Sequence, residues 1–254
     1  MSHKPGSFNW IELGTSDRSA AKAFYSALFG WEAVDKPMEP GGHYIEFRLG
    51  SENVGGGYEL GEQQPGVPPH WMLYIDVADA DAAVAKAKEL GAAIQVGPFD
   101  VSDLGRMAVL HDPTGAHISL WQEKTHHGIA ATGPGTLCWA ELQTPDPEKG
   151  AKFYADWLGW SYEPGPDGYR HISNGGGKEN AIGGIPEKME APPGTPAHWL
   201  IYIAVEDCMA SAAKAISLGA KAMMPATPIP NVGTIAVMTD PQGAVFAMYQ
   251  PPAN

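Results

Sequence analysis

The chain has 254 residues and a formal net charge of −13, from 16 Lys and Arg against 29 Asp and Glu. No basic cluster is present, which argues against a nucleic-acid partner or an anionic membrane surface, because clustered Lys and Arg bind phosphate groups. About 44% of residues are hydrophobic, enough for a buried core, yet no apolar run approaches the roughly 20 residues of a membrane span. The N-terminal segment lacks a secretory pattern, so we expect a cytoplasmic protein. We expect it to be either a monomer or a homodimer.

The sequence of the first half predicts a strand, then a helix, then three strands, and this order occurs twice. Asp17 and Asp79 are typical helix N-caps, and Gly30 and Leu90-Gly91 follow the apolar stripes as helix stops. Strands are expected near 8–15, 31–35, 44–49, 53–58, 70–77, 93–97, 106–111 and 116–121.

The second half repeats the first. Residues 8–31 and 137–160 share nine identities in 24 aligned positions, and His70-Trp71 corresponds to His198-Trp199. The motif Asp-Pro-x-Gly-Ala occurs at 112–116 and again at 240–244. We therefore predict a tandem duplication, with an N-terminal domain over 1–125, a linker over 126–135 and a C-terminal domain over 136–254. Each domain would hold two βαβββ modules, and so many strands per helix favour an α+β fold over a doubly wound parallel sheet.

The segments Leu-Phe-Gly-Trp at 28–31 and Val-Leu-His-Asp-Pro-Thr-Gly-Ala at 109–116 resemble the vicinal oxygen chelate superfamily. That superfamily contains glyoxalase I, extradiol dioxygenases and bleomycin-resistance proteins. Trp-x-Glu-Leu-x-Thr before the first helix is similar to its tandem, glyoxalase-related branch. The resemblance implies two glyoxalase-like domains with cupped mixed sheets, but no single activity, because lyases, dioxygenases, epimerases and drug binders share the fold.

Enzymes of this family hold a metal ion with strand side chains that project into the cup. Carried over to this chain, three of those positions per half fall on Trp10, Met72, Ser119, Trp139, Leu200 and Ala247. None is a good ligand, so we expect no metal cofactor at the usual site. The fourth position lies on the glycine-rich strands near 55–58 and 182–185 and is not placed, although Glu59 is a candidate.

A displaced metal site is the alternative. Side chains alternate along a strand, so Glu12, His70 and His117 would face the same cup, each two residues from a family position. These three would suit a divalent Fe, Ni, Mn or Zn ion. The second half keeps Glu141 and His198, and the simpler interpretation is that these residues hold strand ends or line an apolar pocket.

The leading hypothesis is therefore metal-free binding of a small apolar or partly aromatic molecule in one cup per half. Trp10 and Trp139 would stack on it. The glutamates at 12 and 141 and the histidines at 70 and 198 would orient it, or would act as general base and acid if a reaction occurs. The competing hypothesis is a metal-dependent lyase or dioxygenase that uses the displaced ligands.

Overall fold

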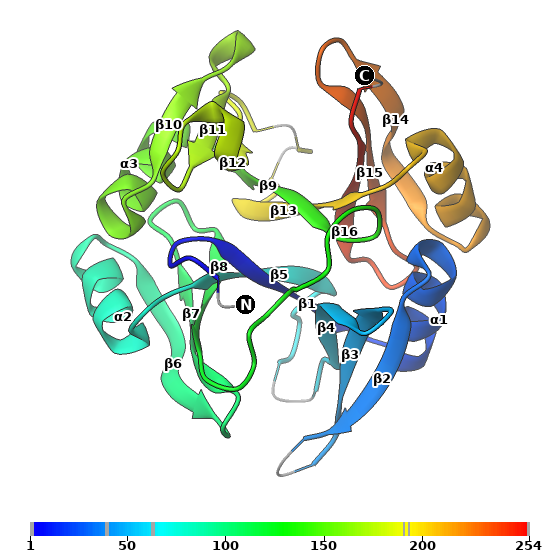
Figure 1. Cartoon of the computed structure of the whole chain (residues 1–254), viewed down its shortest axis with the longest axis horizontal. Helices are drawn as coiled ribbons and strands as arrows, with labels where there is room; N and C mark the ends of the chain where they lie inside the picture. Colours follow the sequence, from blue (N-terminus) through cyan, green and yellow to red (C-terminus); the bar gives the residue numbers. More distant parts are fainter. Residues whose placement is uncertain (1–2, 39–40, 62–63, 190, 193, 253–254) are drawn as a thin grey trace. The chain divides into compact units, whose positions relative to one another are not determined.

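The computed structural model describes residues 3–38, 41–61, 64–189, 191–192 and 194–252 (Figure 1). Its first half contains β1 (Phe8–Thr15), α1 (Arg18–Phe29), β2 (Glu32–Pro37), β3 (His43–Leu49), β4 (Glu52–Glu59), β5 (His70–Asp76), α2 (Ala80–Glu89), β6 (Ala93–Val101), β7 (Gly105–His111) and β8 (His117–Glu123). Its second half contains β9 (Leu137–Gln143), α3 (Pro147–Leu158), β10 (Ser161–Pro164), β11 (Arg170–Ser173), β12 (Ala181–Ile185), β13 (His198–Ala204), α4 (Cys208–Ser217), β14 (Lys221–Ile229), β15 (Gly233–Thr239) and β16 (Val245–Gln250), with short 3-10 turns at Pro166–Gly168 and Lys178–Asn180.

The strands form two sheets with the same order. One runs β2-β3-β4-β1-β5-β8-β7-β6, and the other runs β10-β11-β12-β9-β13-β16-β15-β14. Both are mixed, since β1 pairs with β4 in parallel while β3 pairs with β4 antiparallel. The α+β fold of four βαβββ modules is thus confirmed.

Both helices of the first half begin where the sequence predicts them. The Asp17 side chain accepts from the backbone N–H of Ala20, and Asp79 does the same for Ala82, so each satisfies one of the unpaired donors at a helix start. Gly30 ends α1 in the left-handed region at φ 74°, where a side chain would be strained.

Packing groups the modules differently from their order in the chain. One compact unit, unit 1, comprises 1–9, 72–128 and 139–200. The other, unit 2, comprises 10–71, 129–138 and 201–254. Each unit thus combines segments of both halves, while the boundaries at 125 and 136 stay a prediction about the sequence repeat.

Within each unit, two helices from different halves lie side by side (Figure 1). In unit 2 the Lys214 ammonium of α4 donates to the Leu28 carbonyl of α1. In unit 1 the Trp157 indole of α3 donates to the Ala83 carbonyl of α2, at 2.9 Å. These contacts satisfy donors and acceptors on the paired helices.

A buried hydrogen-bond chain joins the two halves inside each unit, and we call it the Asp triad. In unit 2, Trp71 Nε1 donates to the Tyr25 hydroxyl, which donates to Asp240, both at 2.9 Å. Burial raises the pKa of Tyr25 well above its ordinary value, so it keeps the proton that it donates. In unit 1 the equivalent residues are Trp199, Tyr154 and Asp112.

Candidate functional site

The two faces of β1 have different roles. Ile11 and Leu13 are fully buried in the core of unit 2. Trp10, Glu12 and Gly14 alternate with them and therefore lie on the opposite face. That face carries the residues that the sequence places in a cup.

A tyrosine from the neighbouring hairpin connects the tryptophan and the glutamate. Trp10 Nε1 donates to the Tyr44 hydroxyl at 3.0 Å, and that hydroxyl donates to Glu12 at 2.8 Å. All three belong to unit 2. We call this set the Glu triad. It fixes the indole and the carboxylate relative to each other through one shared hydroxyl group.

Gly56 makes room for this arrangement. On β4 it pairs in register with Glu12 of β1, and the Tyr44 ring crosses above it. A Cβ atom at Gly56 would lie 2.1 Å from the Tyr44 oxygen, so any side chain there would push the tyrosine away from Trp10 and Glu12. The glycine-rich strand thus leaves the space that the Tyr44 ring of the triad occupies.

Unit 1 contains the same triad. Trp139 Nε1 donates to the Tyr169 hydroxyl at 2.9 Å, which donates to Glu141 at 2.8 Å. The other oxygen of Glu141 accepts from Gln143 at 3.0 Å. A Cβ atom at Gly184 would collide with the Tyr169 hydroxyl, so this glycine has the role of its counterpart in unit 2.

The two tyrosines are protonated donors. Burial raises the pKa of Tyr44 well above its ordinary value, and the adjacent Glu12 carboxylate raises it further. Burial and Glu141 raise the pKa of Tyr169 in the same way. In both triads the hydroxyl therefore accepts from the indole and donates to the carboxylate at neutral pH.

The repeated histidines share one tautomer. His70 Nδ1 lies 2.9 Å from the Pro68 carbonyl, and His198 Nδ1 lies 3.0 Å from the Pro196 carbonyl. Because a carbonyl oxygen only accepts, Nδ1 carries the proton and Nε2 of the neutral ring is a proton acceptor. The His70 ring lies over Gly14, since its Cε1 atom would be 2.9 Å from a Cβ there.

The walls of the two triads carry different charges. In unit 2, Glu46 pairs with Arg48 and with Lys36, whose ammonium is 3.6 Å away. In unit 1 the same register position, opposite the glycine of the triad, holds His171. Burial lowers the pKa of His171, so its neutral ring is favoured.

Two polar atoms of β11 are buried without a hydrogen bond in the described part of the chain: His171 Nδ1 and Ser173 Oγ. Their residues are two apart and share a strand face. The His171 ring bonds the Glu163 backbone, so its Nδ1 is left as a lone-pair acceptor. Such an atom is costly unless a bound molecule or water supplies a donor.

The positions that the family resemblance assigns to metal ligands hold side chains that do not fit a divalent metal ion. Trp10 and Trp139 use their indole N–H as donors and offer no lone pair. Leu200 and Ala247 are buried hydrocarbons, and Ser119 is buried with its hydroxyl unpaired among the described residues. Met72 offers only a soft thioether. No group of three or more His, Cys, Asp or Glu residues in the described ranges could hold a metal ion.

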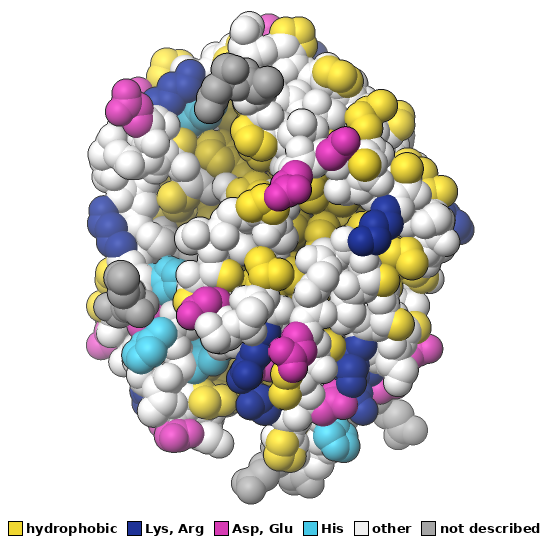
Figure 2. All heavy atoms as spheres, turned by 45° about the vertical axis from the view of Figure 1, so that its right-hand side comes forward, with side chains coloured by type: hydrophobic (Ala, Val, Ile, Leu, Met, Phe, Trp, Pro, Cys, Tyr) yellow, Lys and Arg dark blue, Asp and Glu magenta, His cyan; other side chains and the backbone are white. Residues whose placement is uncertain are grey.

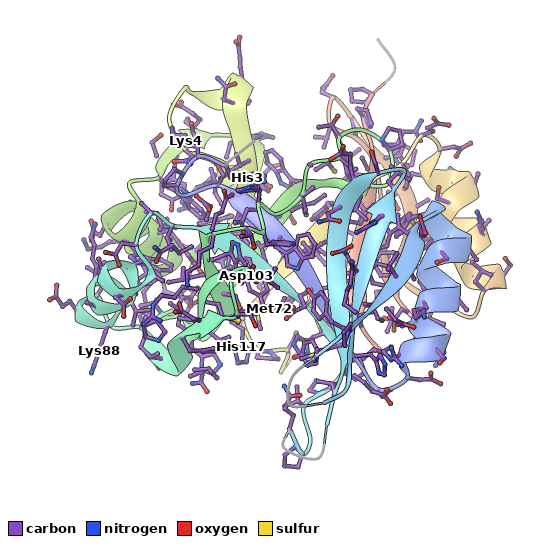
Figure 3. All side chains as sticks on the ribbon, turned by 60° about the horizontal axis from the view of Figure 1, so that its bottom comes forward. His3, Lys4, Met72, Lys88, Asp103 and His117 are labelled. Atoms are coloured by element: carbon purple, nitrogen blue, oxygen red, sulfur yellow. The ribbon has the colours of Figure 1, made fainter. Side chains whose placement is uncertain are left out.

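The residues proposed as displaced ligands divide between the units. Glu12 and His70 belong to unit 2, whereas His117 and Met72, both labelled in Figure 3, belong to unit 1. His117 lies opposite His111 on the neighbouring strand, and their Nε2 atoms are in contact. No observation tests whether the predicted catalytic and ligand-binding residues act as such, and those assignments stay predictions.

A cavity of about 220 Å³ lies in unit 2 beside the hairpin that supplies Tyr44. Tyr58 and Glu59 line it from β4, with Arg18 from the start of α1 and His43 from β3. Burial raises the pKa of Tyr58, and the Glu12 carboxylate contributes to the rise. Tyr58 lines this cavity and pairs in register with Tyr44 of the Glu triad.

The charged surface agrees with the acidic composition. On the face shown in Figure 2, Lys and Arg side chains alternate with Asp and Glu side chains and form no continuous basic patch.

In the described residues no helix is both long and apolar enough to span a bilayer.

The fold and these modules define a class of protein. Residues 7–120 match the Glyoxalase/Bleomycin resistance protein/Dioxygenase superfamily, and residues 139–249 match a glyoxalase-like domain. The chain belongs to this superfamily, with two tandem domains.

Two relatives match the chain over nearly their whole length. The chain is 39% identical to "Putative glyoxylase CFP32" of Mycobacterium tuberculosis, over 98% of this chain and 96% of that protein. It is 30% identical to the anthracycline biosynthesis protein DnrV of Streptomyces peucetius, over 97% and 94%.

Solved structures share the fold. The Mn(II)-bound glyoxalase from Novosphingobium aromaticivorans superposes with a TM-score of 0.68 at 17% identity, covering 97% of this chain and 82% of that one. The 2,3-dioxygenase LapB from Pseudomonas sp. KL28 gives 0.67 at 15% identity, covering 99% and 94%.

Sequence reasoning missed Tyr44 and Tyr169. Tyr44 lies on β3 and Tyr169 directly precedes β11, each two residues before the residue that pairs with the glycine of its triad, Glu46 or His171. The signal was a tyrosine on or next to one strand that coincides with a glycine on the next strand in both halves. It becomes visible only when the strand register is known.

Proposed function

We propose that the chain binds a small, planar, partly aromatic molecule at its Glu triads, without the metal ion that the family's enzymes use. The observation that carries this proposal is a tryptophan in both halves whose indole N–H donates to a tyrosine hydroxyl, which in turn donates to a glutamate. The family resemblance assigns both tryptophans to positions of metal ligands. An indole face offers stacking, and a carboxylate beside it accepts a hydrogen bond from a hydroxyl group.

The relatives support an aromatic ligand. One of them is named for anthracycline biosynthesis and matches the chain over nearly its whole length. Anthracyclines carry a planar hydroxyanthraquinone, whose rings would stack and whose hydroxyl groups would donate. Trp139 is partly exposed whereas Trp10 is 5% exposed, so we propose unit 1 as the stronger of the two sites.

A titration of the chain with a soluble hydroxyanthraquinone, in the presence of EDTA, tests the proposal. We expect saturable quenching of tryptophan fluorescence, and a ten- to hundredfold loss of affinity, on the order expected for a hydrogen bond to a charged group, in Tyr169→Phe. Tyr162→Phe is the matched control, because its hydroxyl bonds the Ala151 carbonyl and takes no part in the triad.

An unchanged affinity in Tyr169→Phe combined with Tyr44→Phe would contradict the proposal. So would binding that requires added Mn²⁺ or Fe²⁺, which would favour a metal-dependent lyase or dioxygenase. A catalytic role for Glu12 with His70, or for Glu141 with His198, remains part of the proposal and is tested by turnover of a bound ligand.

A further inference from the structure

We propose that His111 and His117 form a binding site for a single divalent transition-metal ion, such as Zn²⁺, on the β7–β8 hairpin of unit 1. The site is separate from the family's metal positions and from both Glu triads. Neutral imidazole nitrogens suit Zn²⁺, Ni²⁺ and Cu²⁺.

The geometry of the hairpin brings the two rings together. β7 and β8 are antiparallel, and His111 and His117 are directly opposite in register. Side chains at opposite positions point to the same side of the sheet. Their ring centroids are 3.7 Å apart and their Nε2 atoms are in contact, so one ion could bind both nitrogens after a small rotation of the rings.

A neighbouring amide supports the first ring. The Gln95 amide nitrogen Nε2 lies 3.1 Å from His111 Nδ1. When an ion binds, a half-turn of this amide group would bring its oxygen to the ring, where it would accept from Nδ1–H and leave His111 Nε2 unprotonated for the ion. Most metal-bound histidines are held by a partner of this kind on the second nitrogen.

The turn between the histidines is already rigid. Asp112 Oδ1 accepts from the backbone N–H groups of Thr114 and Ala116, and from the Thr114 hydroxyl. Asp112 also accepts from Tyr154 in the Asp triad. Because the hairpin is ordered before an ion arrives, little conformational entropy is lost on binding.

The other half supplies a natural comparison. On β15 and β16 the equivalent opposed pair is Thr239 and Val245, which offers no imidazole. The same hairpin therefore folds with Thr and Val at these positions. His111→Thr and His117→Val are substitutions that the architecture accommodates.

Calorimetric titration of untagged, chelator-dialysed protein with Zn²⁺ alone tests the site. We expect one ion per chain at pH 7.5, and an affinity at least tenfold weaker in His111→Thr and in His117→Val. His127→Gln, which alters a linker histidine that contacts Glu123, should leave the affinity unchanged.

The double variant combines His111→Thr with His117→Val. The proposal would be overturned if this folded variant bound Zn²⁺ with wild-type affinity, or if His127→Gln lost Zn²⁺ binding. Circular dichroism confirms that the variants are folded. Tyr44→Phe and Tyr169→Phe are expected to keep full Zn²⁺ affinity, so failure of this site and failure of the aromatic site are distinguishable.

Discussion

The Asp triads and the Glu triads are built from the same three kinds of group, yet they differ at the carboxylate. Asp112 is 3% exposed, and its two oxygens accept from its own turn and from Tyr154. Glu12 is half-buried, on the sheet face opposite the core. A tryptophan–tyrosine–carboxylate chain thus stabilises the fold where the carboxylate is enclosed, whereas on the face of β1 opposite Ile11 and Leu13 it leaves the carboxylate partly exposed, which is why we propose that this second chain binds a ligand.

The largest expected effect is on stability, at the Asp triad. Asp112→Ala should lower the free energy of unfolding by about 3 kcal/mol, because several buried backbone and hydroxyl donors lose their acceptor. Glu12→Ala should cost about 1 kcal/mol, because only the Tyr44 hydroxyl loses its acceptor and the carboxylate that is removed is half-exposed. Urea denaturation of both variants measures the difference, and equal losses would remove the distinction between the triads.

The next effect concerns the glycine beneath the tyrosine. Gly184→Ala should weaken hydroxyanthraquinone binding at least tenfold, because a Cβ there displaces Tyr169 from Glu141. Gly61→Ala is the control, since a Cβ at that position meets no atom within 4 Å. Fluorescence titration of the two variants checks this, and similar affinities would show that the tyrosine is dispensable.

A pH effect separates the two units. Burial, together with the charge of Glu123, raises the pKa of Asp76 to about 7, whereas the repeat has Ala204 at this position. The native state therefore holds this proton more tightly than the unfolded chain, so the group's stabilising contribution is complete below about pH 4 and is lost as the pH rises to about 7.

Asp76→Asn should remove this dependence. At pH 8 we expect the variant to be more stable than the wild type by about 1–2 kcal/mol, and Asn9, which donates to Asp76, keeps a partner. Thermal unfolding between pH 4 and pH 8 gives the two curves. If the stabilities of the wild type and the variant change with pH in the same way, the pKa of Asp76 is not raised.

The smallest effect is a surface baseline. Lys152 and Asp156 form an exposed i,i+4 ion pair on α3 at 2.7 Å. Lys152→Ala should change the free energy of unfolding by no more than about 0.5 kcal/mol. A larger change would mean that exposed ion pairs contribute substantially to the free energy of unfolding, contrary to what we expect.

Most of the fold could be predicted from local patterns. Asp17 and Asp79 cap helices because their side chains accept from N–H groups three residues on, a signal that needs no tertiary information. The internal repeat of the sequence predicted the number of modules. The grouping of modules into units could not be predicted, because it depends on contacts such as Tyr25 to Asp240, which are 215 residues apart.

The candidate site was predicted in part. Strand alternation correctly placed Glu12 on the face of Trp10, since that follows from a period of two. Tyr44 and Gly56 were not found, because their contact depends on register between strands. The contact between His111 and His117 was missed for the same reason.

The most direct test of metal-free recognition is the affinity of one hydroxyanthraquinone measured twice, with EDTA and then with saturating Mn²⁺. We expect the same dissociation constant in both conditions, and an affinity at least tenfold weaker in the double variant Tyr44→Phe with Tyr169→Phe. Binding that appears only with Mn²⁺, and that the double variant retains, would contradict it.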